Sequence, residues 1–531
     1  MAKEIKTKST ALMLIVIVAA ILIIINLISL NFFSRFDLTD ESIYSLSESS
    51  KNLVTDLSDK LTIRAYITED LPAPHNGHAR YLKDMLDDYK AYSNGYLQYE
   101  FIDPAKTERE EEAMSYRIPP VQFNVFRNDK TEFIKAYKGL VLLYGDKQHV
   151  LPYIESTQNL EYELTLAIKK LITIDVPFIG FTIGNLEPDM QKGLTAAYQL
   201  LQAEYRVQFI NLDNVRNLPD QLDALFVVQP IEKMNAWELY LIDQFIMRGG
   251  KVSFLFNPFE VNISQAMVTP VDNGLNAMLR SYGIGIHDSL IVDAQCNVIP
   301  VTRDMGGFRV QTIAQYPYFV KISNFNDTIP IVKDLNSLDM LFVSPLDLSL
   351  PLRENQNREV LFSSSEMSGL RAIPIDISPE KQYEQSDFGS ISRPLGAILS
   401  GSFKSYFSRN ETVPQYEGPD TTGLTPFPVK TDSTTDARIV VIGNGSFITD
   451  DFRRSKSGFV LLMNICDWLT QDKGMISIRS RSVSDRALDA RSDGTKQLIK
   501  YTNIFAMPLL VIIFGIVRWQ YKRSQKKRNV S

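Results

Sequence analysis

The stretch ALFVVQPIEKMNAWELYLIDQFIMRGGKVSFLF, residues 224–256, decides the fold class of this chain. It holds two short apolar runs, Ala224–Val228 and Lys251–Phe256, with a helical pattern between them at Ala236–Met247. The helix is predicted to stop at Gly249–Gly250, since glycine commonly ends helices. An apolar run, a helix and a second apolar run are typical of a βαβ crossover, which joins two parallel strands of one sheet.

The same alternation continues on both sides of this unit and predicts a parallel sheet with helices on both faces. Further buried strands are expected at Val176–Ile183, Arg206–Asn211, Leu290–Asp293 and Arg438–Ile442, and further helices at Met190–Glu204, Gly274–Tyr282 and Gly458–Thr470. Residues 300–436 are less regular, and Ser408–Arg438 has the Pro, Thr, Asp and Gly content of a long exposed loop. We therefore expect one α/β domain over residues 176–475 with an irregular insertion at 300–436.

A smaller α/β domain is expected at residues 61–175. Its first strand, Leu61–Ile67, alternates apolar and polar side chains with a period of two, and residues 79–92 show helical spacing. The predicted order of elements, β-α-β-α-β-β-β-α, resembles a thioredoxin-like layer. The loop after the first strand, Thr68–Pro72, contains no cysteine, so CxxC redox chemistry is not expected.

Both ends of the chain have the composition of membrane spans. Residues 11–33 carry no charged side chain, and Ala11–Leu30 is long enough at about 1.5 Å per residue to cross a hydrocarbon core of about 30 Å. Residues 501–517 form a second uncharged run, at the short limit for a span. A cleaved signal peptide is the alternative for the first run, and a buried core helix is the alternative for the second.

Basic residues flank both predicted spans, in the N-terminus at 1–10 and in the tail at 518–531. Since lysine and arginine near membrane ends stay cytoplasmic, both termini are predicted to be cytoplasmic. A connector at 34–60 and a tether at 476–500 would then join the spans to a large periplasmic body. The predicted location is the inner (cytoplasmic) membrane, with two spans.

Composition and motifs exclude several functional classes. The net charge of −6, without a basic helix rich in aromatic residues, disfavours nucleic acid as a partner. The two cysteines, Cys296 and Cys466, are too few for a disulfide framework and form no CxxC pair. No G-x-x-x-x-G-K-[ST] sequence occurs, so the chain is not a P-loop ATPase, and four histidines leave little for a catalytic triad. No cofactor and no metal is expected.

One candidate contact loop follows the last predicted strand of the large domain. Gly443, Asn444 and Gly445 come directly after Ile442, at the carboxyl end of a parallel strand, where α/β proteins usually bind ligands. A purely structural turn is the alternative for this loop.

Two adjacent carboxylates, Asp450 and Asp451, follow the loop, and such a pair could bind a cation or act as acid and base. Capping of the next helix is the alternative for this pair.

Three groups of residues resemble the GldG family, auxiliary subunits of ABC-2-type transporters named from gliding motility in Bacteroidota. They are Phe36–Thr39 with Tyr44–Ser47, Gly249–Val252 running into Phe256–Pro258, and Arg438–Gly445 followed by Asn464–Leu469. Their order and spacing cover nearly the full length of the chain. Members of the family often show Gly-His-Gly-Glu after the first strand of the large domain, where this chain has Gly184, Asn185, Leu186 and Glu187.

The resemblance implies a fold, partners and a role. It implies a thioredoxin-like domain followed by an amidotransferase-like α/β domain without the amidotransferase nucleophile. It also implies an ABC-2-type permease and a cytoplasmic ATP-binding subunit as partners. The absent histidine weakens any claim that the loop at Gly184 carries chemistry.

The leading hypothesis is a non-catalytic, membrane-anchored periplasmic auxiliary subunit of an ABC-2-type transport complex, associated with gliding in some relatives. Two alternatives remain open: an anchored envelope hydrolase that uses Glu187 with Asp450 and Asp451, and a solute-binding component of a transporter. The expected ligand or partner contacts are Gly184, Asn185, Glu187, Gly443, Asn444, Gly445, Asp450 and Asp451.

Overall fold

The computed structural model describes most of the chain between residues 45 and 470. The described residues are 17, 45–68, 75–127, 130–154, 157, 159–172, 176–263, 265–305, 308–333, 335–409, 412–419, 426–452, 456–470, 500, 501, 505, 514–516, 518 and 519. The chain divides into two compact units, Met1–Ser484 and Asp485–Ser531, and the elements below belong to the first.

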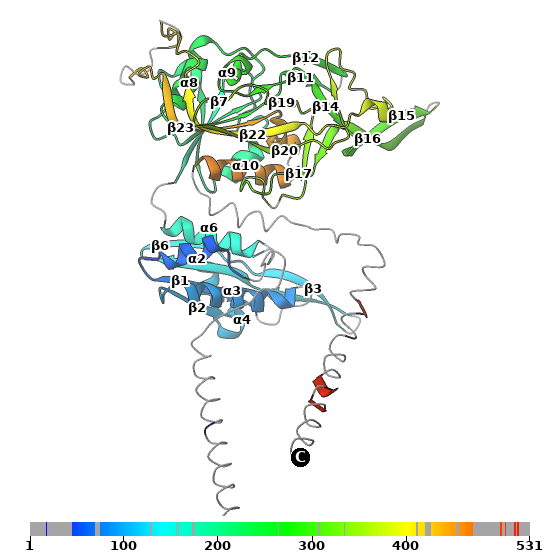
Figure 1. Cartoon of the computed structure of the whole chain (residues 1–531). Coiled ribbons are helices and arrows are strands. Elements are labelled where there is room, and N and C mark those ends of the chain that lie inside the picture. Colours follow the sequence, from blue (N-terminus) through cyan, green and yellow to red (C-terminus); the bar gives the residue numbers. More distant parts are fainter. Residues whose placement is uncertain are drawn as a thin grey trace, which may run out of the picture. The chain divides into compact units, whose positions relative to one another are not determined.

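The N-terminal part of this unit is built on a four-stranded mixed sheet (Figure 1). Its elements are α2 (Glu48–Thr55), β1 (Leu61–Ile67), the 3-10 helix η1 (His75–Gly77), α3 (His78–Tyr92), β2 (Leu97–Ile102), α4 (Pro104–Thr107), α5 (Glu110–Ser115), β3 (Val121–Arg127), β4 (Lys130–Ala136), β5 (Lys138–Tyr144), β6 (Lys147–Leu151) and α6 (Leu160–Ile172). The strand order is β2-β1-β5-β6, with β1 parallel to β2 and antiparallel to β5. The apolar sides of α2, α3 and α6 share one core with β1, β2 and β5.

The larger part follows from residue 176. Its first half contains β7 (Phe178–Ile183), α7 (Thr195–Leu201), β8 (Arg206–Asn211), η2 (Leu212–Asn214), β9 (Ala224–Val228), α8 (Ala236–Met247), β10 (Lys251–Leu255), β11 (Phe259–Asn262), β12 (Met267–Pro270), α9 (Leu275–Ser281), β13 (Gly285–Ile286) and β14 (Leu290–Asp293). Its second half contains β15 (Cys296–Met305), β16 (Phe308–Ile322), β17 (Asn324–Phe325), β18 (Leu338–Leu341), β19 (Leu346–Asp347), β20 (Gln356–Ser363), β21 (Ser368–Arg371), η3 (Gln385–Asp387), β22 (Pro394–Lys404), β23 (Ser433–Ile442), η4 (Ser446–Ile448), η5 (Asp450–Phe452) and α10 (Lys456–Leu469).

An eight-stranded sheet organises this part, in the order β17-β20-β22-β23-β10-β9-β7-β8. The five strands from β23 to β8 run parallel, as the apolar runs in the sequence predict. Numbered along the chain, the parallel strands lie in the order 2-1-3-4-5, so that β7 and β9 are neighbours although β8 separates them in sequence. The described residues therefore form a mixed α/β structure with large sheets.

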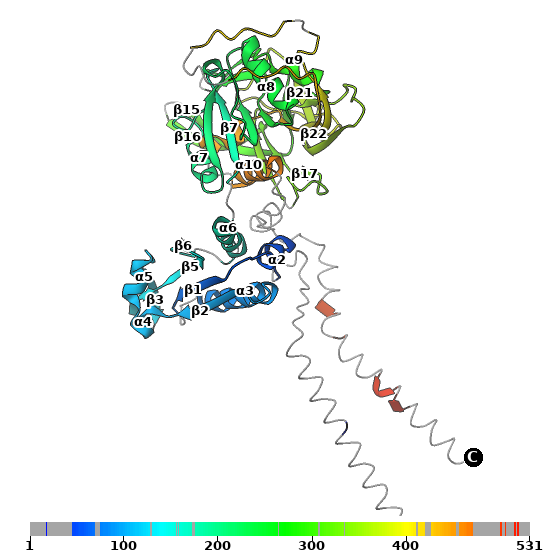
Figure 2. The same cartoon turned by 90° about the vertical axis from the view of Figure 1, so that its left-hand side faces the viewer.

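Alternate residues of the central strands enter two different cores. In β9, Ala224, Phe226 and Val228 pack on the side of α7 and α10, whereas Leu225 and Val227 pack on the side of α8 and α9. Figure 2 shows these two pairs of helices on opposite sides of the sheet. Burial on both faces explains why the strand is a continuous apolar run rather than an alternating one.

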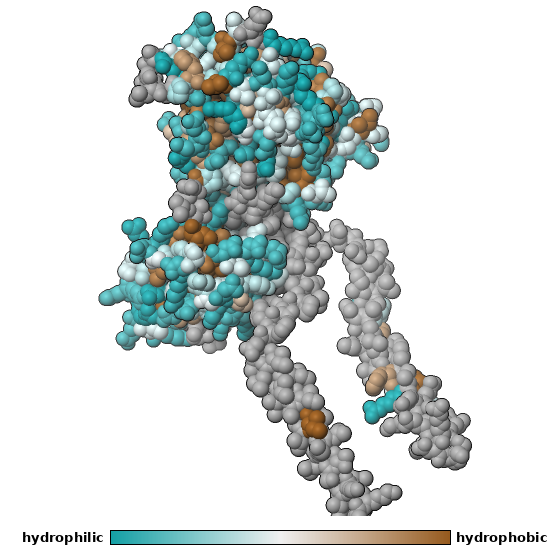
Figure 3. Space-filling model, turned by 60° about the vertical axis from the view of Figure 1, so that its left-hand side comes forward, coloured by the Kyte–Doolittle hydropathy of each residue, from teal (hydrophilic) through white to brown (hydrophobic). Residues whose placement is uncertain are grey.

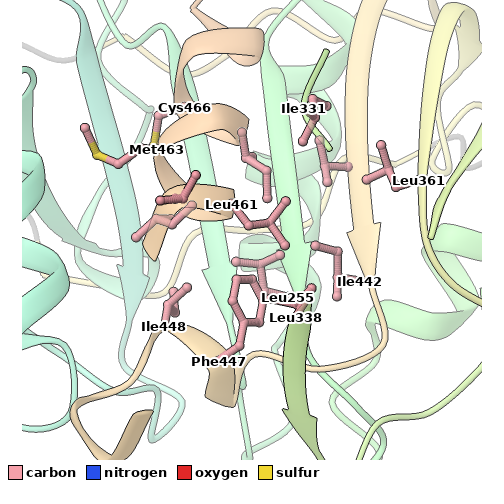
Figure 4. Close-up of a cluster of buried hydrophobic side chains, with 14 of the residues drawn as sticks. Leu255, Ile331, Leu338, Leu361, Ile442, Phe447, Ile448, Leu461, Met463 and Cys466 are labelled. Carbon is pink, nitrogen blue, oxygen red and sulfur yellow. The ribbon is translucent and has the colours of Figure 1, made fainter. Parts of the chain in front are cut away.

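Helix α10 closes the first of these cores. Its residues Leu461, Met463 and Cys466 pack in the same cluster as Leu255 of β10 and Ile442 of β23 (Figure 4). Cys466 is fully buried and packs as a small apolar residue of this helix.

Residues 300–436 contain more regular structure than the sequence predicts. Within this range β20 and β22 pair antiparallel and extend the large sheet beyond β23. Strand β22 is interrupted by a bulge between Gly401 and Phe403, and Gly401 has a φ of +104°. A Cβ atom at Gly401 would lie 2.1 Å from the backbone oxygen of Asn355, so the close approach of the two strands requires glycine. Bulges and glycines obscure the alternation by which a strand is recognised in sequence.

The expectation of a membrane helix at each end is corrected. Among the residues that the structure describes, no helix has both the length and the apolar composition to cross a membrane. The longest described helix, α3, has 15 residues, or about 22 Å at 1.5 Å per residue, which is shorter than a hydrocarbon core. The predicted spans at 11–33 and 501–517 fall almost entirely outside the described residues.

The predicted location, an inner membrane protein with two spans and a periplasmic body, depended on those helices and is corrected with them. On the face shown in Figure 3, the described residues present mainly hydrophilic side chains, and the apolar patches between them are small and scattered.

Candidate functional site

A cleft of about 1220 Å³ lies at the carboxyl ends of the parallel strands. Its walls come from the segments that follow β7, β9, β10 and β23, together with the ends of β8 and β18. The chain leaves β7 through α7 on one face of the sheet and leaves β9 through α8 on the opposite face. Because the two connections diverge, they leave a crevice between neighbouring strands, which is the usual ligand position in open α/β sheets.

The segment after β7 is held in place by Asn185. Its backbone oxygen accepts hydrogen bonds from the amides of Ile231 (2.9 Å) and Glu232 (3.1 Å), in the segment after β9. Its side-chain amide donates to Oε1 of Glu238 in α8, at 2.7 Å. These three bonds connect the two edges of the crevice, so the position of the segment is well defined.

Two residues of this segment have left-handed backbone conformations. Gly184 has a φ of +128° and Leu186 a φ of +61°. A bulky apolar residue at positive φ is strained, and Leu186 is also 63% exposed at the cleft. The anchoring through Asn185 accounts for how the chain maintains this conformation.

Glu187 is the most unusual side chain of the cleft. It lines the cleft and is only 8% exposed. Its Oε2 accepts a hydrogen bond of 2.6 Å from the amide of Asn185, whereas its Oε1 has no hydrogen-bond partner among the described residues. The Thr182 hydroxyl is close enough to favour the ionised carboxyl, but it makes no hydrogen bond of normal geometry with it. Burial raises the pKa of Glu187 above its ordinary value, and the hydrogen bonds offset this only in part.

A second buried carboxyl, Glu238, belongs to the N-terminus of α8. It forms a capping box with Asn235: Oδ1 of Asn235 accepts from the Glu238 amide at 2.9 Å, and Oε2 of Glu238 accepts from the Asn235 amide at 2.7 Å. Burial raises the pKa of Glu238, and the nearby carboxyls of Asp213 and Glu187 add to that shift. Both oxygens of Glu238 are occupied by protein donors, so its role is structural.

The three residues after β23 have structural roles. A Cβ atom at Gly443 would lie 1.8 Å from the backbone oxygen of Ser344, and one at Gly445 would lie 2.2 Å from that of Leu255. Glycine is therefore required at both positions by close backbone packing. Asn444 lines the cleft but is 1% exposed, and its side chain donates to the backbone oxygen of Leu341 at 2.7 Å.

Asp450 caps a helix that is distant in sequence. Its two carboxyl oxygens accept hydrogen bonds from the backbone amides of Thr195 (3.1 Å) and Ala196 (2.8 Å), in the first turn of α7. In the sequence, the alternative to a cation-binding or acid–base role for Asp450 was capping of the next helix, α10. The structure shows that the helix it caps is α7. Asp451 is exposed at the edge of the cleft.

The structure therefore brings both predicted contact segments to one cleft. Five of the eight predicted residues line it: Gly184, Glu187, Asn444, Asp450 and Asp451. The other three, Asn185, Gly443 and Gly445, lie behind this lining and support it.

Sequence reasoning missed several residues of the cleft. Asp189, Lys192, Asn257 and Glu260 line it, but none of them was predicted as a contact residue. Asn257 could have been found from its position, because it comes two residues after the end of the buried strand β10. Within the described ranges, no group of three or more His, Cys, Asp or Glu side chains is arranged to hold a metal ion.

The sequence matches known protein families over two ranges. Residues 177–464, more than half of the chain, match the model of a family described as an ABC-type uncharacterized transport system. Residues 40–143 match a domain of unknown function. An uncharacterized protein of Borreliella burgdorferi is 22% identical over 502 residues, which cover 92% of this chain and 94% of that protein. The match supports the general family of transport auxiliaries and does not single out GldG.

Two solved structures resemble parts of the chain. The N-terminal domain of mmIFT52 has a TM-score of 0.33 and 14% identity, and the alignment covers 55% of this chain and 97% of that one. The exo-beta-1,4-mannosidase Op5Man5 from Opitutaceae bacterium strain TAV5 has a TM-score of 0.24 and 12% identity, with coverages of 73% and 49%. At these TM-scores neither similarity shows a shared fold or function.

Proposed function

Because this chain belongs to the family described as an ABC-type uncharacterized transport system, we propose that it is a non-catalytic accessory subunit of an ABC transporter. The family match carries this proposal. The proposed partners are an ABC-2-type permease and a cytoplasmic ATP-binding subunit.

The sequence supports the role of an accessory subunit rather than that of the ATP-hydrolysing subunit. It contains no G-x-x-x-x-G-K-[ST] loop to hold the phosphates and magnesium of ATP. ATP hydrolysis would therefore be supplied by another subunit.

The geometry of the cleft favours binding over hydrolysis. The hydrolase alternative uses Glu187 with Asp450 and Asp451, and a hydrolase needs its second carboxylate placed to take or give a proton. Both oxygens of Asp450 instead accept amide hydrogens from α7, and Asp451 is exposed to solvent at the edge of the cleft. We therefore propose that the segments at 184–187 and 443–451 position a contact site for a ligand or partner.

Affinity purification of the tagged full-length chain from its own host, followed by mass spectrometry, tests the proposed function. The expected result is enrichment of a permease and an ATP-binding subunit of one ABC system over an untagged control. Enrichment of neither subunit would contradict the proposal.

A second measurement tests the non-catalytic role. The purified chain should show no ATP hydrolysis by itself. Hydrolysis that co-elutes with the chain and survives removal of all partner subunits would contradict it.

A further inference from the structure

We propose that the cleft binds a primary ammonium group carried on an aliphatic body, with Glu187 as its main acceptor. This inference rests on the proposed function, because it assigns a chemical class to the ligand or partner group at the same site. Three independent features of the cleft support it: its charge, the unpaired oxygen of Glu187, and its apolar wall.

The described residues of the cleft lining carry mainly negative charge. Among them five are acidic and one, Lys192, is basic. The acidic residues are Glu187, Asp189, Glu260, Asp450 and Asp451. A concave surface lined by one sign of charge attracts groups of the opposite sign.

The unpaired oxygen of Glu187 provides a specific acceptor. A buried acceptor without a partner is costly, so a native structure usually has a reason for one. Oε2 of Glu187 is already bonded to the Asn185 amide, whereas Oε1 has no hydrogen-bond partner in the part of the chain that the structure describes and can accept one further hydrogen. An N–H group of a cation gives the short, charge-assisted bond that a buried carboxylate favours.

The spacing of the carboxylates argues for an organic cation rather than a metal ion. Calcium needs six to eight oxygen ligands at about 2.3–2.6 Å. No three acidic side chains in the described part of the chain converge closely enough for this. An ammonium group needs few direct acceptors and also gains from carboxylates that lie further away.

The apolar wall indicates what carries the ammonium group. Leu186 and Ile263 line the cleft and are 63% and 60% exposed, and Phe259, Val261 and Phe342 line it as well. These side chains would pack against methylene groups beside the ammonium. The volume of about 1220 Å³ exceeds that of most small-molecule pockets and accommodates several residues of a peptide.

The ammonium group could come from a free alkylamine or from a lysine side chain of a partner. Isothermal titration calorimetry on the purified full-length chain distinguishes these sources with two probes, n-hexylamine and an end-blocked Leu-Lys-Leu-Lys peptide. Hexanol and the corresponding Leu-Glu-Leu-Glu peptide are the neutral and acidic controls. Binding of either amine probe, with no binding of the controls, supports the proposal, and the probe that binds identifies the source.

Variants of the full-length chain test the role of Glu187. Glu187→Gln keeps the shape of the side chain and is expected to weaken binding of the amine by at least about tenfold. Glu354→Gln is the matched control, since Glu354 is exposed and lies outside the cleft, and it should leave affinity unchanged. Asp451→Asn removes an exposed charge at the edge of the cleft, and its smaller effect should disappear at about 0.5 M salt.

The proposal is overturned if neither amine binds, or if Glu187→Gln and Glu354→Gln bind it equally well. Circular dichroism melting of each variant establishes that the chain is folded.

The failure of this inference is distinguishable from failure of the proposed function. If the permease and ATP-binding subunit co-purify with a chain that binds no amine, the accessory role stands and only the ammonium site is wrong.

Discussion

The side-chain amide of Asn185 donates a hydrogen bond of 2.7 Å to the carboxyl group of Glu238, a residue 53 positions further along the chain. Glu238 also caps α8, so a single buried pair connects the loop after β7 to the helix that follows β9. The crevice at the carboxyl edge of the sheet is therefore a fixed feature of the fold. Its shape depends on a few buried polar contacts that can each be tested.

Replacing Asn185 should destabilise the protein. Asn185→Leu removes the donor to Glu238 and leaves a buried carboxyl oxygen unpaired, which we expect to cost about 1–3 kcal/mol of unfolding free energy. Urea unfolding followed by circular dichroism measures the change. Asn357→Leu is the control, because Asn357 is exposed and its side chain bonds to Glu359 on the surface, and it should change stability by less than about 0.5 kcal/mol. Equal midpoints for the two variants would show that the buried pair is not important for stability.

Glu187→Gln should stabilise the folded protein at neutral and higher pH. Because burial raises the pKa of Glu187 above its ordinary value of 4.5, the unfolded chain loses this proton at lower pH than the folded chain does. The wild-type carboxyl therefore destabilises the folded state increasingly as pH rises from about 4.5 to its folded pKa. Glutamine removes this penalty, and its amide can donate to the Thr182 hydroxyl.

The expected gain from Glu187→Gln is about 1 kcal/mol at pH 8, at the lower end of the cost of an unpaired buried acceptor. It should become small near pH 4, where the carboxyl is mostly protonated in both states. Thermal melts of wild type and variant across pH 4–8 measure the difference. A gain that is as large at pH 4 as at pH 8 would show that ionisation of Glu187 is not its cause.

Gly443→Ala should be strongly destabilising. The new methyl group would lie 1.8 Å from the backbone oxygen of Ser344, and this backbone cannot move aside without disturbing the hydrogen bond of 2.8 Å that the Ser344 amide donates to the Gly443 oxygen. We expect a loss of about 3 kcal/mol or more, in the range of severe overpacking. Gly77→Ala is the control: apart from its chain neighbours, no described residue has an atom within 4 Å of the added methyl group, so unfolding midpoints should stay close to wild type. A Gly443→Ala protein as stable as the control would refute the close-packing explanation.

Asp450→Ala should loosen α7 locally. Loss of its bonds to the amides of Thr195 and Ala196 removes the cap of this helix and should cost about 0.5–2 kcal/mol. Hydrogen exchange measured by mass spectrometry should speed up in a peptide covering Thr195–Leu201. Asp451→Ala serves as the control, and its exchange in the same peptide should match that of wild type. Unchanged exchange in both variants would rule out the capping role.

Local patterns in the sequence were sufficient for many elements of the large domain. The predicted strands Arg206–Asn211 and Ala224–Val228 and the predicted helix Ala236–Met247 agree with β8, β9 and α8. These segments are buried along one or both faces, and burial leaves a clear apolar run or period. Strands β20 and β22 were missed because bulges interrupt their pairing and shift the alternation.

By itself the sequence determined that parallel strands alternate with helices, and that polar loops follow β7 and β23. Only the tertiary structure decided that β9 lies beside β7, that Asp450 caps α7 across 255 positions, and that one oxygen of Glu187 has no partner among the described residues around the cleft. The reason is physical. Hydropathy records how deeply each segment is buried, whereas strand order and long-range hydrogen bonds depend on how the segments pack together.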